Sequence, residues 1–132
     1  MKLVIDTSVI IAVLTSEPER EKLVQQTRGV DLLAPASVHW EVGNALAAML
    51  KRKRMTHGQL HPVINAYEQI PIRFIDIELQ GALEIAAAHD LYAYDAYIIE
   101  CARESRCSLI SLDRSLVQAA RAAGVGVLEV PS

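Results

Sequence analysis

Four acidic side chains are the main candidates for chemistry in this sequence, because each stands beside or within an apolar segment that a fold would bury. A carboxylate in such a place needs a partner, since burying an unpaired charge is costly. If the four share one crevice, their mutual repulsion calls for a cation, and ligation by oxygen alone selects Mg²⁺ or Mn²⁺. Such an ion suits phosphodiester hydrolysis, because it activates a water and neutralises charge on the phosphate. The four acids are Asp6, Glu41, Asp95 and Asp113.

Asp6 and Asp113 each stand at the end of an apolar run that is predicted to be a strand. Asp6 directly follows residues 2–5, and Asp113 lies just past residues 108–111. In a parallel sheet both would lie at the carboxyl edge, where open α/β sheets place their ligand crevices. The alternative is a simpler role, because each Asp precedes a helical segment and could cap its exposed N–H groups.

Glu41 and Asp95 lie inside segments with helical periodicity. Asp95 shares a helix face with Ile98, so its carboxylate is directed towards apolar surroundings. Glu41 shares a face with Val38, and Asn44 follows close to one turn later. The alternatives are a first-turn acid that complements the helix dipole for Asp95, and a polar helix edge for Glu41.

The composition fits one compact domain, predicted to span residues 1–132. The chain is 52% hydrophobic, and its formal net charge of −3 argues against binding nucleic acid through an overall positive field. A polyanion would therefore meet a local patch. A dense basic cluster is the candidate for this patch, with a solvated helix end as the alternative. The basic cluster consists of Lys51, Arg52, Lys53 and Arg54.

The sequence predicts a cytoplasmic protein with no membrane association. Asp6 interrupts the N-terminal run MKLVIDTSVIIAVL early, whereas a membrane span needs about 20 apolar residues. Cys101 and Cys107 have neither a CxxC motif nor a zinc-finger spacing, so we expect free thiols rather than a disulfide. We expect His39 to pack or to face solvent, because no second His stands at a ligand spacing from it.

Short apolar runs alternate with longer amphipathic segments, and no repeat or linker interrupts them. The runs predict strands at 2–5, 31–34, 72–75, 108–111 and 125–130. The segments between them predict helices at 8–14, 17–27, 37–53, 56–69, 78–88, 93–105 and 115–123. This alternation indicates right-handed crossovers, and hence an α/β fold with a mainly parallel five-stranded sheet between two helical layers.

Individual residues mark several of the predicted helix ends. Gly29 and Gly124 stand where a helix end favours a positive φ, and Ser37 and Thr56 are predicted N-caps. Pro62 fits poorly inside its helix, so it either kinks that helix or delays its start.

Four motifs occur in the order and spacing of the PIN-domain ribonucleases, and most closely resemble VapC-type toxins of bacterial toxin–antitoxin pairs. They are LVIDTSVIIAVL, HWEVGNAL, LYAYDAYIIECA and SLISLDRSL, which together extend over nearly the whole chain. The resemblance implies a PIN-like fold and endonucleolytic cleavage of RNA by a metal-activated water, leaving a 5′-phosphate and a 3′-hydroxyl. It implies that Asp6, Asp95 and Asp113 bind Mg²⁺ or Mn²⁺. Glu41 would bind a second ion or help to deprotonate the water.

The resemblance also implies supporting residues and partners. Small polar residues that support the acids or the water fall on Thr7, Ser8, Asn44 and Ser111. Arg114, like the basic cluster, is a candidate contact for RNA phosphate. The implied partners are a cognate antitoxin that blocks the acidic crevice, often with a basic side chain, and a second copy of the chain in a homodimer.

Some positions depart from the family pattern. Many members carry Thr where this chain has Ser111, and some carry a further acid where it has Ser115. Asp90 is the substitute acid if Asp95 is only structural.

Other functions remain as alternatives. A phosphatase with an Asp nucleophile would have a second Asp where Ser8 stands, and a phospho-receiver domain would have a Lys after a late strand. A non-catalytic PIN-like module that binds RNA or a protein is the stronger alternative, although retention of all four acids argues against it.

Overall fold

The fold is organised around one parallel sheet. The structure is a computed structural model that describes residues 1–131, so the last residue of the predicted domain, Ser132, lies outside the described residues. The strand order is β3-β2-β1-β4, and every neighbouring pair is parallel. The strands are β1 (Lys2–Ile5), β2 (Asp31–Pro35), β3 (Ile72–Ile75) and β4 (Ser108–Ile110).

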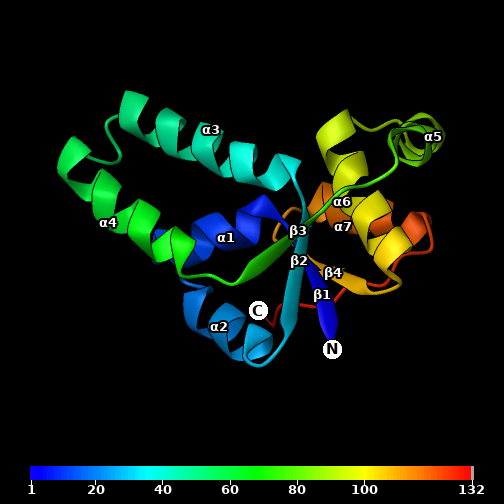
Figure 1. Ribbon diagram of the computed structural model, residues 1–132, viewed down its shortest axis with the longest axis horizontal. Helices are drawn as coiled ribbons and strands as arrows, with labels where there is room; N and C mark the ends of the chain where they lie inside the picture. Colours follow the sequence, from blue (N-terminus) through cyan, green and yellow to red (C-terminus); the bar gives the residue numbers. More distant parts are fainter. Residues whose placement is uncertain (132) are drawn as a thin grey trace.

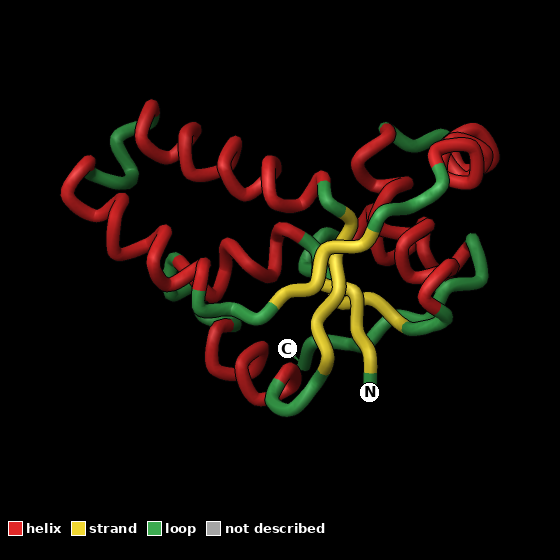
Figure 2. Tube along the Cα trace, in the orientation of Figure 1, coloured by secondary structure: helices red, strands yellow, loops and turns green. Residues whose placement is uncertain are grey.

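Helices cover both faces of this sheet, so the predicted three-layer α/β/α fold is confirmed. In Figure 1, α1–α4 lie on one side of the sheet and α5–α7 on the other, and Figure 2 shows the strands as a band between the two groups. The helices are α1 (Thr7–Leu14), α2 (Arg20–Thr27), α3 (Ser37–Lys51), α4 (His57–Glu68), α5 (Leu79–His89), α6 (Ala93–Ser105) and α7 (Arg114–Ala122).

The order of the strands explains this division of the helices. The path from β1 to β2 to β3 moves across the sheet in one direction, and β4 then returns to the other side of β1. Because crossovers between parallel strands are right-handed, this reversal puts the later helices on the opposite face. The reversal lies between β1 and β4, and such a switch point opens a crevice at the carboxyl ends of the two strands.

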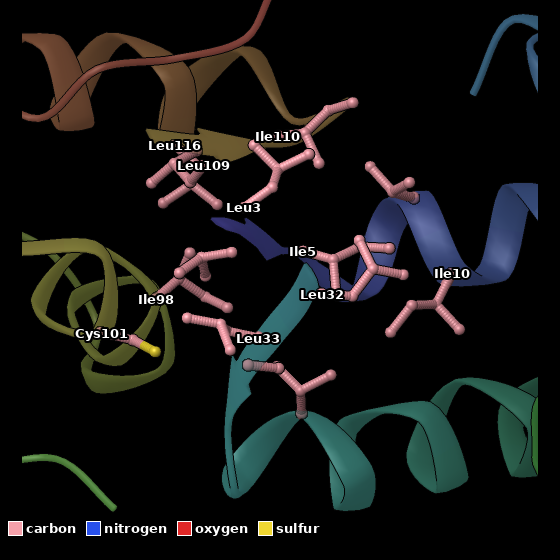
Figure 3. Close-up of a cluster of buried hydrophobic side chains, with 14 of the residues drawn as sticks. Leu3, Ile5, Ile10, Leu32, Leu33, Ile98, Cys101, Leu109, Ile110 and Leu116 are labelled. Atoms are coloured by element: carbon pink, nitrogen blue, oxygen red, sulfur yellow. The ribbon is translucent and has the colours of Figure 1, made fainter. Parts of the chain in front are cut away.

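The core consists of strand residues buried from both faces, which explains why the strand sequences are continuously apolar. Leu3, Val4, Leu109 and Ile110 are all completely buried. Figure 3 shows side chains of several strands and helices meeting in this cluster, including Ile98 of α6. Each such burial contributes roughly 1.5–3 kcal/mol, so the core fixes the strand ends that carry the acids.

The predicted fifth strand at 125–130 is wrong as a regular element. Only one isolated bridge, between Leu109 and Val127, links this segment to β4. Two hydrogen bonds accompany it, from the Leu109 N–H to Gly126 O (3.0 Å) and from the Leu128 N–H to Leu109 O (2.8 Å). Gly126 approaches β4 so closely that a Cβ would meet the Ser108 hydroxyl at 2.6 Å. A glycine at such a position weakens a strand, and here the pairing stops after one bridge.

Most helix boundaries agree with prediction to within two residues, and the exceptions have local causes. α2 begins at Arg20 rather than at residue 17, because Pro18 disfavours helical geometry for Glu17. Ala36, and not Ser37, is the N-cap residue of α3. Thr56 is confirmed as the N-cap of α4, which runs through Pro62 and does not start later.

Several smaller predictions are also settled. Gly29 and Gly124 have the expected positive φ values of 73° and 80°. Cys101 and Cys107 are free. His39 packs, as expected, and its Nδ1 lies 2.9 Å from the Tyr67 hydroxyl. In the described part of the chain, no helix is both long enough and apolar enough to cross a bilayer.

Candidate active site

Asp6 is held at the carboxyl end of the central strand β1. It is 7% exposed, and it occupies the N-cap position of α1 without capping that helix through its side chain. Its Oδ2 instead accepts hydrogen bonds from the hydroxyls of Ser8 and Ser111, both at 2.7 Å. The capping alternative is therefore wrong for Asp6, whose carboxylate is bonded across to β4 through the Ser111 hydroxyl.

The same two hydroxyls tie this carboxylate to the loop after β4. Ser8 Oγ accepts from the Leu112 N–H at 3.0 Å, and Ser111 Oγ accepts from the Asp113 N–H at 3.0 Å. Each serine thus donates to the acid of one strand and accepts from the loop of the next. This network fixes the separation of the strand ends that carry Asp6 and Asp113.

Asp113 is exposed and does cap the helix that follows it. Its Oδ1 accepts from the Ser115 N–H at 2.9 Å and from the Leu116 N–H at 3.3 Å. The capping alternative therefore holds for this residue. Both of these bonds use a single oxygen of the carboxylate.

Glu41 reaches the site from the second turn of α3. Burial raises its pKa to about 7, with the charge of Asp6 adding to the rise, Ser37 offsetting part of it and Asp95 adding further. Its Oε2 is buried and finds no hydrogen-bond partner within residues 1–131. A buried carboxylate oxygen in this state carries a desolvation cost that a cation or a proton would relieve.

Asp95 enters from the first turn of α6, on the opposite helical layer. Burial raises its pKa, and the charges of Asp113 and Asp6 raise it further. Because a helix N-terminus acting alone would stabilise the ionised carboxylate, the dipole alternative does not account for its environment. The four acids thus come from four different elements. Glu41 and Asp95 are each within electrostatic reach of Asp6, Glu41 also of Asp95, and Asp95 also of Asp113.

The residues present fit a hydrated divalent ion better than a closed protein cage. The donors are carboxylates and hydroxyls, which are oxygen ligands suited to Mg²⁺ or Mn²⁺. In residues 1–131, no three His, Cys, Asp or Glu side chains form a group that could hold an ion by themselves. Mg²⁺ commonly keeps several waters and uses only one or two carboxylates, so the unpartnered Glu41 oxygen and the mutual repulsion of the acids are consistent with such an ion.

The other predicted residues are placed unequally. Thr7 lies beside Asp6, and its hydroxyl is buried without a partner in the described residues. Asn44, which the resemblance implies as a supporting residue, is exposed on α3. Arg114 is exposed next to Asp113, and the substitute acid Asp90 is an exposed residue that ends α5.

The basic cluster lies away from the acids. It is fully exposed where α3 ends and the chain turns towards α4. Lys51 follows Glu41 by ten residues on the same helix, which corresponds to about 15 Å at 1.5 Å per residue. Figure 1 shows this turn at the far end of the α3–α4 pair from the sheet.

Sequence reasoning missed the contribution of Ser37. Ser37 was predicted only as an N-cap. It instead begins α3, where it offsets part of the rise in the pKa of Glu41, and its buried hydroxyl has no hydrogen-bond partner within residues 1–131. The spacing of four residues between Ser37 and Glu41, which places them on one helix face, is the signal that could have found it.

Comparison with known proteins identifies the family. The family model that describes the PIN domain matches residues 3–122. The chain belongs to the PIN-domain family. PIN domains are generally nucleases and generally use divalent metals. No curated protein sequence matches the chain significantly.

Solved structures share this PIN fold at low sequence identity. The structure of PAE2754 from Pyrobaculum aerophilum has a TM-score of 0.73 at 20% identity, covering 96% of this chain and 83% of that one. VapBC2 from Rickettsia felis, bound to a DNA fragment from its promoter, gives 0.72 at 11% identity, covering 97% and 98%. A toxin–antitoxin complex from Klebsiella pneumoniae gives 0.65 at 16% identity, with 98% of both chains covered.

Proposed function

We propose that this PIN domain is a metal-dependent endoribonuclease and the toxin of a type II toxin–antitoxin pair. The observation that carries the proposal is that Asp6 and Asp113 follow the carboxyl ends of two paired strands and are tied together through Ser8 and Ser111, while Glu41 and Asp95 come within electrostatic reach of Asp6. Structural neighbours that include VapBC2 and a toxin–antitoxin complex support the toxin role. The family supports nuclease chemistry.

In this proposal the acids position an ion and the reacting water. Asp6, Asp95 and Asp113 hold Mg²⁺ or Mn²⁺, with Ser8 and Ser111 fixing the orientation of the Asp6 carboxylate. When bound, the ion activates water and offsets the charge that develops on the phosphate. The protein supplies position and charge and no covalent nucleophile, so the products are a 5′-phosphate and a 3′-hydroxyl.

Glu41 has two possible roles in the proposed reaction. It either helps to bind a second ion or accepts the proton of the attacking water. Its pKa of about 7 lies near neutral pH, which is favourable for a general base. Its unpartnered Oε2 is available for either role.

The proposal includes partners for this crevice. A cognate antitoxin would block the acids with a basic side chain, and a homodimer would form through helices. RNA phosphates would contact the basic cluster and Arg114, all of which are exposed. The protein would act in the cytoplasm, where its RNA substrate is found.

The test is incubation of the purified protein with mixed RNA in Mn²⁺. We expect cleavage that is lost with EDTA and in the Asp6→Asn variant, with 5′-phosphate ends on the products. Cleavage that survives both controls would refute the mechanism. RNA that is bound but never cut would favour the non-catalytic module, and rapid phosphate release from a small phosphomonoester would instead indicate a phosphatase.

A further inference from the structure

A cavity of about 360 Å³ lies at the carboxyl ends of β2 and β3. Its volume is within the roughly 300–1,000 Å³ range of small-molecule sites. Its walls come from the ends of β2 and β3 and from the helices α3, α5 and α6, and they include Pro35, Ser37, Ile75, Asp76, Leu79 and Tyr97. The cavity therefore occupies the β2–β3 half of the edge, whereas Asp6 and Asp113 occupy the β1–β4 half.

The elements that hold the acids also form the walls of this cavity. Ser37 lies one turn before Glu41 on α3, and Tyr97 lies two residues after Asp95 on α6. β2, which ends at the cavity, pairs directly with β1, and paired strands are about 4.8 Å apart. A nucleotide with its phosphate at the acids can therefore reach the cavity with its own base or that of a neighbour.

The chemistry of the walls selects a base rather than a phosphate. The lining is mostly apolar, and it includes one aromatic residue, Tyr97, and one acidic residue, the exposed Asp76. A carboxylate accepts hydrogen bonds and repels phosphate. Guanine presents two adjacent donors on its Watson–Crick edge, N1–H and N2–H₂, which match the two oxygens of one carboxylate.

We propose that this cavity binds an unpaired guanine of the RNA substrate, with Tyr97 stacking on the base and Asp76 accepting its N1–H and N2–H₂. The proposal rests on the proposed function, because it assigns a substrate subsite to that active site. Bases of single-stranded RNA are commonly read by aromatic stacking together with hydrogen bonds to their edges. Asp76 determines specificity and Tyr97 supplies affinity.

The surroundings of Tyr97 support this role. Its ring packs edge-to-face against Tyr94, with ring centroids 5.9 Å apart and planes at 86°. Such a pair restrains the ring before any ligand arrives, which lowers the entropic cost of stacking. Leu79, on the α5 wall, is 59% exposed and would be covered by the bound base.

The test is titration of the metal-free protein with the four 5′-nucleoside monophosphates, followed by amide chemical shifts in NMR spectra. Because the four share one phosphate, differences between them report on the base. We expect GMP to shift the amides around Ile75 and Leu79 and to bind roughly tenfold more tightly than UMP, which lacks an amino group. Asp76→Asn should remove this preference, whereas the matched control Asp31→Asn, an exposed acid at the start of β2, should retain it.

Variants of the ring test the stacking role separately. Tyr97→Leu should weaken all four nucleotides by roughly tenfold, and Tyr97→Phe should restore their binding, because it keeps the ring. Equal affinities for the four nucleotides, or shifts confined to another surface, would overturn the proposal. Variants that bind nucleotides normally but lose affinity for a protein partner would assign the cavity to that partner instead.

The outcomes also separate this inference from the proposed nuclease. A GMP preference in a protein that never cuts RNA would leave the guanine site standing and remove the nuclease. RNA cleavage by a protein whose cavity binds no nucleotide would support the nuclease and remove the guanine site.

Discussion

The Asp6 carboxylate is positioned by two hydroxyls that also hold the loop after β4. Ser8 and Ser111 both donate to its Oδ2 at 2.7 Å, and each accepts a backbone N–H from that loop. Hydrogen bonds to a charged group contribute roughly 1.5–3 kcal/mol each. Small side chains thus bind the two strand ends of the crevice together.

Replacing one of these hydroxyls should damage both stability and activity. Ser111→Ala removes a donor to Asp6 and leaves the Asp113 N–H without its acceptor, so we expect the free energy of unfolding to fall by about 1–3 kcal/mol. Urea denaturation measures this change. Ser115→Ala is the matched control, because Ser115 is exposed and bonds Asp113 through its backbone N–H. Equal losses in the two variants would contradict a specific role for Ser111.

The elevated pKa of Glu41 predicts a pH-dependent stability without metal. An acid whose pKa is raised in the folded state stabilises it fully below the unfolded value of about 4.5, and this contribution is lost as the pH rises through about 7. In EDTA, the Glu41→Gln variant should therefore have a higher melting temperature than the wild type at pH 8, and this difference in melting temperature should vanish at pH 4. A variant that is less stable at pH 8 would show that the charged Glu41 is well compensated.

At the scale of elements, α5 and α6 pack closely because a glycine allows it. A Cβ on Gly81 would clash with the Glu100 carboxylate. Glu100 is completely buried, and its carboxylate accepts from the Arg103 Nε at 2.6 Å and pairs with the same guanidinium. Glu100 and Arg103 both belong to α6, whose first turn carries Asp95, and Gly81 leaves room for this pair at the contact with α5.

Substituting that glycine should separate the two helices. We expect Gly81→Ala to destabilise the fold, because the added methyl displaces a buried carboxylate from its cation. Gly43→Ala is the control: Gly43 is also inside a helix, but a Cβ there meets nothing within 4 Å, so this change should stabilise by about 0.5–1 kcal/mol. Thermal melts of the two variants should therefore shift in opposite directions, and a shared direction would refute the packing argument.

At the scale of the whole molecule, the acids lie around the carboxyl edge of the sheet, whereas the basic cluster lies at the far end of the α3–α4 pair. RNA cut at the crevice would have to extend along α3 to reach Lys51–Arg54. A Lys or Arg side chain far from the acids contributes to RNA affinity through counterion release and does not take part in the cleavage step. The cluster should therefore affect binding more than the rate of cleavage.

Charge reversal in the basic cluster tests that expectation. Arg52→Glu should weaken RNA binding. It should also make the decrease of log K for RNA association with log salt concentration less steep, by at least about 0.7, which is the contribution of one single-strand phosphate contact. Arg28→Glu, an exposed change at the end of α2, is the control. Fluorescence anisotropy at several salt concentrations gives the slope, and an unchanged slope for Arg52→Glu would exclude the cluster from the RNA interface.

Binding of an ion should stabilise the whole fold, because it would offset the repulsion that the charge of Asp6 exerts on Glu41 and Asp95. A ligand that binds only the native state raises its stability according to its concentration and affinity. We expect Mn²⁺ to raise the melting temperature of the wild type by several degrees and to have a much smaller effect on Asp6→Asn. Equal shifts in both proteins would place the ion elsewhere.

The sequence by itself determined the elements and the class of fold. The continuous apolar strands and intervening helices follow from local periodicity, so their order and the parallel sheet could be predicted to within two residues at most boundaries. Asp6 could be placed at the carboxyl edge because it directly follows a strand. The fifth strand could not be excluded, since the close approach of Gly126 to Ser108 is a contact between distant parts of the fold.

Only the tertiary structure decided which acids are buried and which groups form hydrogen bonds with them. Capping was a local possibility for both Asp6 and Asp113, and the long-range hydroxyl of Ser111, together with that of the neighbouring Ser8, separated the two cases. The orphaned oxygen of Glu41 and the exposure of Asn44 depend on what packs against α3, which periodicity does not specify. Burial and charge at a site are sums over neighbours from several elements, and those neighbours are set only when the sheet and its two layers come together.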